Sequence, residues 1–228
     1  GSIASTCSRN VDAGFSIVAF VLPTTAETIG HGLSKAPELI IQKGRATGSA
    51  WWTFIKPLGN TKAMRLDTTY WTETSTNFWD DTDPTPSLVT IGAGSGSDNN
   101  WIMYCFHSVD GYSKVGSYEG NGEYGGEGVF VYTGFKPAYL MVKRADTTGH
   151  WWIKDSARDA ANDTSDYLRA DAVNADDVGW GSGSNGGNCN FLSNGFKWEG
   201  NYASMNASGG TYIYLAFAET PFKYSNAR

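Results

Sequence analysis

Short apolar runs alternate along the chain with turns rich in Gly, Asn, Asp and Ser. The runs Leu39–Ile41 and Leu140–Val142 are continuously apolar and bounded by charged residues, which predicts strands buried on both faces. A turn follows each run and leads to a tryptophan pair, which predicts two hairpins. Residues 155–170 are alanine-rich, but they contain a strong turn sequence that limits a helix there to a turn or two. We therefore expect an all-β protein.

Four blocks of residues recur in the same order in the two halves of the chain. Gly14–Val18 is echoed by Gly111–Val115, Lys35–Lys43 by Phe135–Lys143, Trp51-Trp52 by Trp151-Trp152, and Trp101–Phe106 by Tyr212–Phe217. The stretches between the blocks differ in length and sequence, which is typical of a shared core with divergent surface loops. The prediction is an antiparallel β-sandwich, jelly-roll or lectin-like, built from two sequence repeats.

The repeats also predict the domain boundaries. Residues 1–13 are interpreted as a tag remnant and linker, because Gly1-Ser2 resembles the scar of a cleaved tag. Residues 14–110 form the first repeat and residues 111–228 the second. The segment that joins them lacks the composition of a linker, so we expect the repeats to pack as one compact unit. Whether they build one sandwich or two stays open.

Charge and cysteine content narrow the classes of partner. The chain has 17 basic and 23 acidic residues and a formal charge of −6, which argues against a nucleic-acid partner. No apolar run is long enough to predict a membrane-spanning helix. Cys105 lies in a strand-like run and is expected to be buried, whereas pairing of Cys7 with Cys189 stays open.

No combination of residues indicates catalysis. The three histidines are scattered without the spacing of a metal site or a triad, and they are expected at the surface: His31, His107 and His150. Three carboxylates share a glycine-rich loop where nothing would desolvate them: Glu119, Glu123 and Glu127. We therefore expect a protein that is not an enzyme.

Two acidic clusters could supply oxygen ligands to a metal ion. They are Asp80–Asp83, and Asp171 with Asp176 and Asp177. Ca²⁺ is the ion that such loops would hold, although solvated turns explain both clusters adequately. No cofactor is expected.

Aromatic residues in the divergent stretches are the best candidates for ligand binding. A ring in a loop offers a flat apolar face to a sugar, and a neighbouring Asp or Asn supplies directional hydrogen bonds. The tryptophan pairs recur in both halves, so they are expected mainly in the core. The predicted ligand-binding residues are Trp79, Asp81, Trp180, Asn185, Trp198 and Tyr202.

Several ordered strings give the chain a family resemblance. They are Gly14–Val18, Gly30–Leu33, Tyr104–Phe106, Gly111–Ser113, Gly116–Gly122, Phe130–Pro137, Phe191–Phe196 and Tyr212–Glu219, with Pro221-Phe222. Between residue 13 and about residue 225 the chain resembles a domain of bacteriophage tail and tail-fibre proteins. The resemblance implies an extracellular protein of the virion tail that meets the host surface beside other tail proteins. It brings no catalytic or binding residues with it.

Three functions are compatible with these features. The first is a non-catalytic receptor-binding module that attaches the phage to a host polysaccharide or another receptor, with avidity raised by display on a homotrimeric fibre. The second is a structural tail component without a ligand, which a large exposed apolar patch would favour. The third is a glycan depolymerase, which requires two carboxylates facing each other across a groove.

Overall fold

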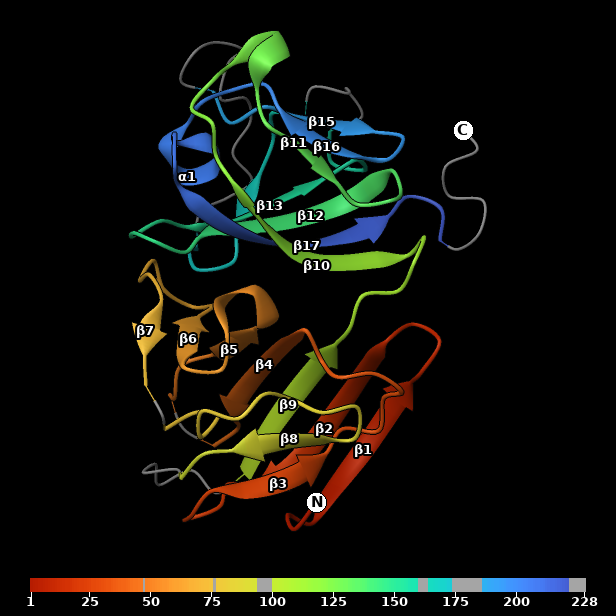
Figure 1. The fold of residues 1–228 in the computed structure, drawn as a ribbon, viewed down its shortest axis with the longest axis vertical. Helices are drawn as coiled ribbons and strands as arrows, with labels where there is room; N and C mark the ends of the chain where they lie inside the picture. The colour runs from red at the N-terminus through yellow and green to blue at the C-terminus, as the bar shows by residue number, and fades with distance from the viewer. Residues whose placement is uncertain (47, 76, 94–99, 160–163, 174–185, 222–228) are drawn as a thin grey trace. The chain divides into compact units, whose positions relative to one another are not determined.

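The computed structural model describes residues 1–46, 48–75, 77–93, 100–159, 164–173 and 186–221 (Figure 1). These residues form antiparallel sheets, one short helix, α1 (Ala203–Asn206), and two 3₁₀ turns, η1 (Lys56–Leu58) and η2 (Gly125–Glu127). The protein is therefore all-β, as predicted. The chain divides into two compact units, and each is described by itself. Unit 1 comprises residues 1–67 and 72–108, and unit 2 comprises residues 68–71 and 109–228.

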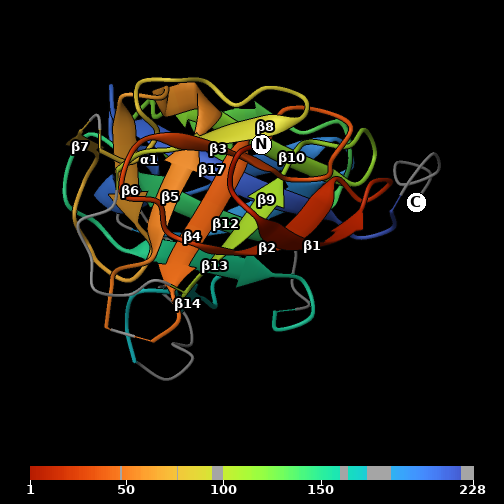
Figure 2. The same ribbon diagram turned by 90° about the horizontal axis from the view of Figure 1, so that it is seen from below.

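Unit 1 is built on one large sheet and one small sheet. The large sheet has the strand order β1 (Ser5–Asn10), β2 (Phe15–Val21), β9 (Asn100–Phe106), β4 (Leu39–Gly44), β5 (Trp52–Ile55), β6 (Lys62–Arg65) and β7 (Glu73–Thr74). Figure 2 shows these strands side by side. The small sheet pairs β3 (Glu27–Gly30) with β8 (Leu88–Ile91). Apolar side chains from both sheets form one core, so the unit is β-sandwich-like.

Unit 2 has the same two-layered, β-sandwich-like construction. Its larger sheet has the order β10 (Ser113–Glu119), β17 (Thr211–Ala218), β12 (Pro137–Arg144), β13 (Trp151–Asp155) and β14 (Leu168–Arg169). Its smaller sheet has the order β11 (Phe130–Tyr132), β16 (Gly195–Trp198) and β15 (Cys189–Leu192). The core between the sheets is rich in aromatic residues drawn from both of them, and Met205 of α1 packs into it.

The central strands of the two larger sheets follow the same order, β2-β9-β4-β5 in unit 1 and β10-β17-β12-β13 in unit 2. Leu39 of β4 is opposite Phe106 of β9, and Tyr139 of β12 is opposite Phe217 of β17, so the matching blocks of sequence also match in register. The first block is the exception. Phe106 is opposite Phe15, whereas Phe217 is opposite Ser113, one residue beyond the position that the sequence match predicts.

The N-terminal segment departs from the prediction. Residues 5–10 were expected to be linker, but they form β1, which pairs along its whole length with β2. Every residue of β1 is exposed, so the strand carries no alternation of apolar and polar residues that would reveal it. The unit boundary after Ser108 falls close to the boundary predicted between the repeats. Their packing as one compact unit stays a prediction.

Candidate functional site

A pocket opens at one end of the unit 1 core, where the end of β4 meets the beginnings of β5 and β9. Gln42 of β4 is paired with Trp52 of β5, and Gly44, two residues further along the same face of β4, is paired with Trp101 of β9. Residues two apart on a strand lie on the same face, so Gln42 and Gly44 both lie on the face of β4 that is turned toward the core. Because Gly44 has no side chain, β4 leaves the space beside Trp101 unfilled at this end.

The pocket encloses about 330 Å³, which is at the lower end of the range for small-molecule sites. Its lining is mostly apolar and aromatic, with three polar side chains, and comprises Leu22, Gln42, Ser49, Ala50, Trp52, Asn77, Phe78, Ile91, Gly92, Ala93 and Trp101. None of these described residues carries a charge. The pocket is therefore suited to a neutral ligand that has both apolar faces and a few polar groups.

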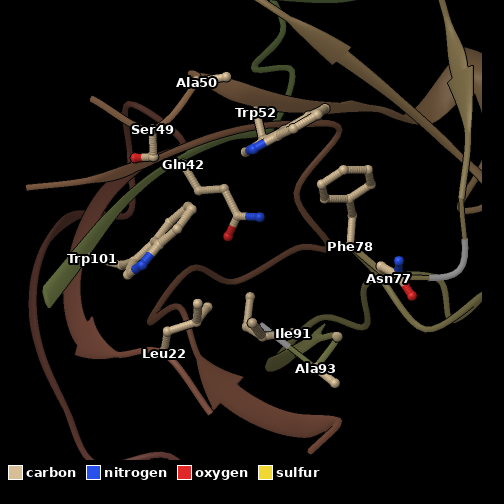
Figure 3. A pocket seen from close by; sticks show the side chains of 11 residues that line it. Leu22, Gln42, Ser49, Ala50, Trp52, Asn77, Phe78, Ile91, Ala93 and Trp101 are labelled. Atoms are coloured by element: carbon tan, nitrogen blue, oxygen red, sulfur yellow. The ribbon is translucent and has the colours of Figure 1, made fainter. Parts of the chain in front are cut away.

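Gln42 supplies the buried polar group of the pocket. Its side chain reaches into the middle of the pocket between the rings of Trp52 and Trp101 (Figure 3). The residue is only 3% exposed, and its Oε1 atom accepts no hydrogen bond from any described residue. Most buried polar groups in proteins are hydrogen-bonded, and an unpaired one destabilises the fold. A ligand with an N–H or O–H group would satisfy this oxygen.

The aromatic wall is fixed in place before any ligand arrives. The rings of Trp52 and Phe78 are 4.0 Å apart between centroids, and the guanidinium of Arg65 lies 4.7 Å from the centroid of the Trp52 ring. Gly92 brings the Phe78 segment close to β8, since its N–H donates to the Phe78 carbonyl at 2.9 Å. A Cβ at Gly92 would lie 2.2 Å from the Asn77 carbonyl oxygen, so only glycine allows this approach.

Polar groups at the edge of the pocket are partly held by the backbone turn after β4. The Ser49 hydroxyl oxygen accepts hydrogen bonds from the Lys43 Nζ at 3.2 Å and from the Gly44 N–H at 3.1 Å. Asn77 is exposed. The arrangement combines flat rings, one buried amide and exposed hydrogen-bonding groups, and such sites hold small polar molecules that also have apolar faces.

Two of the tryptophans predicted to bind ligand belong to the cores instead. Trp79 is 1% exposed, packs against Phe54, and donates its indole N–H to the Lys62 carbonyl at 3.2 Å. Trp198 of β16 is also 1% exposed and packs against Phe196. Both rings are therefore part of the packing of their units. Turn residues beside a tryptophan do not determine which way its ring points.

The remaining predicted site residues are not brought together by the described structure. Asp81 is exposed in a turn where it adopts a positive φ of 47°. Tyr202 is half-buried in unit 2, with its ring 5.8 Å from that of Trp152. Trp180 and Asn185 lie outside the described residues. Neither Asp81 nor Tyr202 lines the pocket around Gln42.

The histidines are less exposed than predicted. His31 is fully buried in unit 1; its Nδ1 accepts the Leu33 N–H, and its Nε2 lies 3.1 Å from the Thr85 carbonyl oxygen. Burial lowers the pKa of His31, and the nearby His107 adds to this effect, while the contact with Thr85 opposes it. His107 is also buried. The prediction of surface positions for these two histidines is wrong.

His150 in unit 2 is partly exposed and is held by a buried carboxylate. Its Nδ1 lies 2.8 Å from Asp171 Oδ2, and Asp171 Oδ1 accepts the Trp151 N–H. In unit 1 Asp67 accepts the Trp51 N–H in the same way, at 3.2 Å, but the residue before Trp51 is Ala50. Each aspartate therefore anchors the start of a strand, and Asp171 is used by the fold rather than left free for a metal.

The described part of the chain contains no group of three His, Cys, Asp or Glu residues placed to hold a metal ion. Asp80 and Asp81 occupy a turn with positive φ, while Asp176 and Asp177 lie outside the described residues. Cys7 is exposed, and Cys105 and Cys189 are buried.

The pattern of the sequence does not reveal the residues that line the pocket. Trp52 and Trp101 lie in the repeated blocks, and this predicts a scaffold role for them. One signal was available, since the matching blocks differ at a single polar position inside the strand: Gln42 stands where the second half has Val142. A buried amide in an otherwise apolar strand is unusual enough to direct attention to its surroundings.

The fold and the pocket together define an all-β protein of two units, one of which holds a small neutral pocket lined with aromatic residues. The chain belongs to the family described as a domain of unknown function, DUF7483, whose model matches residues 1–221. No curated protein and no solved structure matches it. Within the described residues, no helix has the length and apolar character needed to cross a membrane.

Proposed function

We propose that this protein is a non-catalytic receptor-binding module and that the unit 1 pocket holds one sugar residue of a cell-surface glycan. The observation that supports this most is Gln42, whose unpaired amide oxygen points into a cavity bordered by Trp52, Phe78 and Trp101. Sugars combine hydroxyl donors with apolar C–H faces, and rings beside a buried amide complement both features.

The setting of this activity is proposed to be the distal tail of a bacteriophage. The support is the resemblance of the ordered strings between residue 13 and about residue 225 to tail and tail-fibre domains. In that setting the ligand would be a polysaccharide of the host surface, and other tail proteins would be neighbours. A pocket that holds one sugar binds weakly on its own, so display on a homotrimeric fibre would raise avidity.

We further propose that the two halves derive from one duplicated β-repeat of lectin-like or jelly-roll type. Beyond the common strand order, a second correspondence supports duplication. Arg65 is paired with Trp52 and stacks on its ring at 4.7 Å, while Arg169 is paired with Trp152 and stacks on its ring at 4.8 Å. Such a pair outside the matched blocks is hard to explain by general β-sheet constraints alone.

Binding to a panel of bacterial surface polysaccharides tests the proposed function. The wild-type protein is expected to bind at least one of them, and the variant Gln42→Leu, which keeps the volume and removes the amide, is expected to lose that binding. Tyr132→Ala in unit 2 is the matched control, because it removes an exposed aromatic ring outside the pocket. A reducing-sugar assay on the same polysaccharides runs in parallel, and release of product would overturn the non-catalytic assignment.

A structural role in the tail is the second candidate, and one surface favours it. Phe130 and Tyr132 are 44% and 64% exposed on the same face of β11, a strand at the edge of its sheet. Exposed aromatic residues on an edge strand are suited to association with another chain. If this face joins copies of the protein, Phe130→Ser with Tyr132→Ser should abolish self-association in sedimentation experiments and leave Gln42-dependent binding intact.

A further inference from the structure

We propose that the unit 1 pocket selects an N-acetylated amino sugar. This inference rests on the proposed function, because it names the class of sugar that the same pocket would take. It follows from three features of the pocket: the amide oxygen of Gln42, which no described residue pairs, an aliphatic wall across from Trp52, and described lining residues without charge.

The amide of Gln42 matches an acetamido group. An acetamido N–H can donate to the buried Oε1, and because this secondary amide is trans, its methyl group lies on the same side as the N–H while its carbonyl points away. A sugar hydroxyl can also donate to this oxygen, but it brings no methyl group with it. Gln42 is only 3% exposed, so its oxygen has little access to water. A ligand that does not donate a hydrogen bond to this oxygen therefore leaves a buried acceptor unpaired, which weakens binding.

The aliphatic wall offers a place for the acetyl methyl group. Leu22, Ile91 and Ala93 lie across the pocket from Trp52, with the Gln42 amide between the two walls (Figure 3). A sugar ring that carries only hydroxyls would put polar groups against this wall. An acetamido group paired with Gln42 carries a methyl group next to the paired atoms, so it can be buried against these side chains.

The uncharged lining argues against charged sugars. None of the described lining residues is ionised, so the carboxylate of a uronic acid or the ammonium of a free amino sugar would be desolvated there without a partner. The cations beside the pocket are already engaged. The Arg65 guanidinium lies over the Trp52 ring and pairs with Glu73, and the Lys43 Nζ donates to the Ser49 hydroxyl. Acetylation removes the charge of an amino sugar, and this is the form that the pocket accommodates.

Calorimetry and saturation-transfer NMR with methyl glycosides test the selection. The probes are N-acetylglucosamine, glucose, glucosamine, glucuronic acid and a 6-deoxyhexose, which has a methyl group but no amide. We expect N-acetylglucosamine to bind about tenfold tighter than glucose, as one buried methyl and a satisfied polar group predict. Its acetyl protons should receive the strongest saturation, and the charged sugars should bind no better than glucose.

Variants separate this inference from the proposed function. Gln42→Leu should erase the difference between N-acetylglucosamine and glucose, whereas Tyr132→Ala should leave it unchanged, and circular dichroism should show both variants folded. Equal binding of glucose and N-acetylglucosamine, or tighter binding of the 6-deoxyhexose, would overturn the selection and leave a sugar-binding pocket. Absence of binding to every sugar and polysaccharide would overturn the proposed function itself.

Discussion

The larger sheets of the two units share a strand order, yet a tryptophan near the start of the corresponding strand lines a pocket in unit 1 and is buried in unit 2. Trp52 is half-buried and lines the pocket, whereas its counterpart Trp152 is 1% exposed. Gln42, opposite Trp52, corresponds to Val142, opposite Trp152. The strands alone therefore do not determine whether this tryptophan is buried or lines a pocket. Other parts of the chain determine it.

In unit 2 the segments that connect the strands cover Trp152. The rings of Tyr167 and Tyr202 contact Trp152 with centroids 4.6 and 5.8 Å away, and helix α1 follows Tyr202 directly. The Tyr212 hydroxyl donates to the Ala203 carbonyl at 2.7 Å and accepts the Ala207 N–H, which fastens α1 to β17. Val142, which is opposite Trp152, is covered in this way and can therefore be apolar. A pocket can therefore form where one end of a β-sandwich core lacks such a cover.

The largest effect expected from this comparison is on stability. Trp152→Ala should destabilise unit 2 by about 4 kcal/mol, because it opens a large cavity that its packed neighbours cannot fill. Trp52→Ala should destabilise unit 1 by less than half of that, since this ring already borders open space. Urea unfolding, with hydrogen exchange of peptides from each unit, measures both. Equal losses would show that the two tryptophans are equally buried and would remove the basis of the comparison.

A smaller loss is expected when unit 2 is given the polar residue of unit 1. Val142→Gln should cost about 3 kcal/mol, because the amide is larger than the space available and would be buried without partners. Val142→Leu is the control for the change in volume and should cost less. Both values come from the same unfolding experiment. A neutral Val142→Gln would mean that a cavity like that of unit 1 can open in unit 2.

Acid should also distinguish the units. The buried His31 of unit 1 has a lowered pKa, so in unfolded protein it takes up a proton near pH 6.5 while in folded protein it stays neutral. Its contribution to stability is complete above about pH 6.5 and declines as the pH falls toward its folded pKa, by up to about 1.4 kcal/mol per pH unit. Hydrogen exchange of unit 1 between pH 7 and pH 5 measures this decline, and His31→Gln should make it shallower. An unchanged slope in His31→Gln would assign the decline to other groups.

The sequence predicts strands where burial requires a pattern of apolar residues. It does not predict features that leave no such pattern. The apolar run Leu39–Ile41 lies within β4, since strands buried on both faces must be apolar. β1 was missed because an exposed edge strand needs no apolar residues. The ring of Trp79 could not be placed, because the turn beside it, at Asp80 and Asp81, fixes the backbone but not the direction in which the preceding side chain packs. The pocket itself depends on which segments cover the core, and that is a property of the tertiary structure.

The smallest expected change in stability is also the sharpest test of the comparison. Gln42→Val gives unit 1 the residue of unit 2 and removes a buried acceptor that no described residue satisfies. It should raise the free energy of unfolding by up to about 1 kcal/mol. The amide that is removed is a buried polar group whose oxygen accepts no hydrogen bond from a described residue, so its loss removes a desolvation cost. The same variant should also lose the proposed binding of a glycan. Natural proteins often retain destabilising groups where they bind ligands, so a gain in stability together with a loss of binding is the expected signature. Stability lowered by Gln42→Val would mean that the amide supports the fold, and the pocket would then be better explained as an imperfection of core packing.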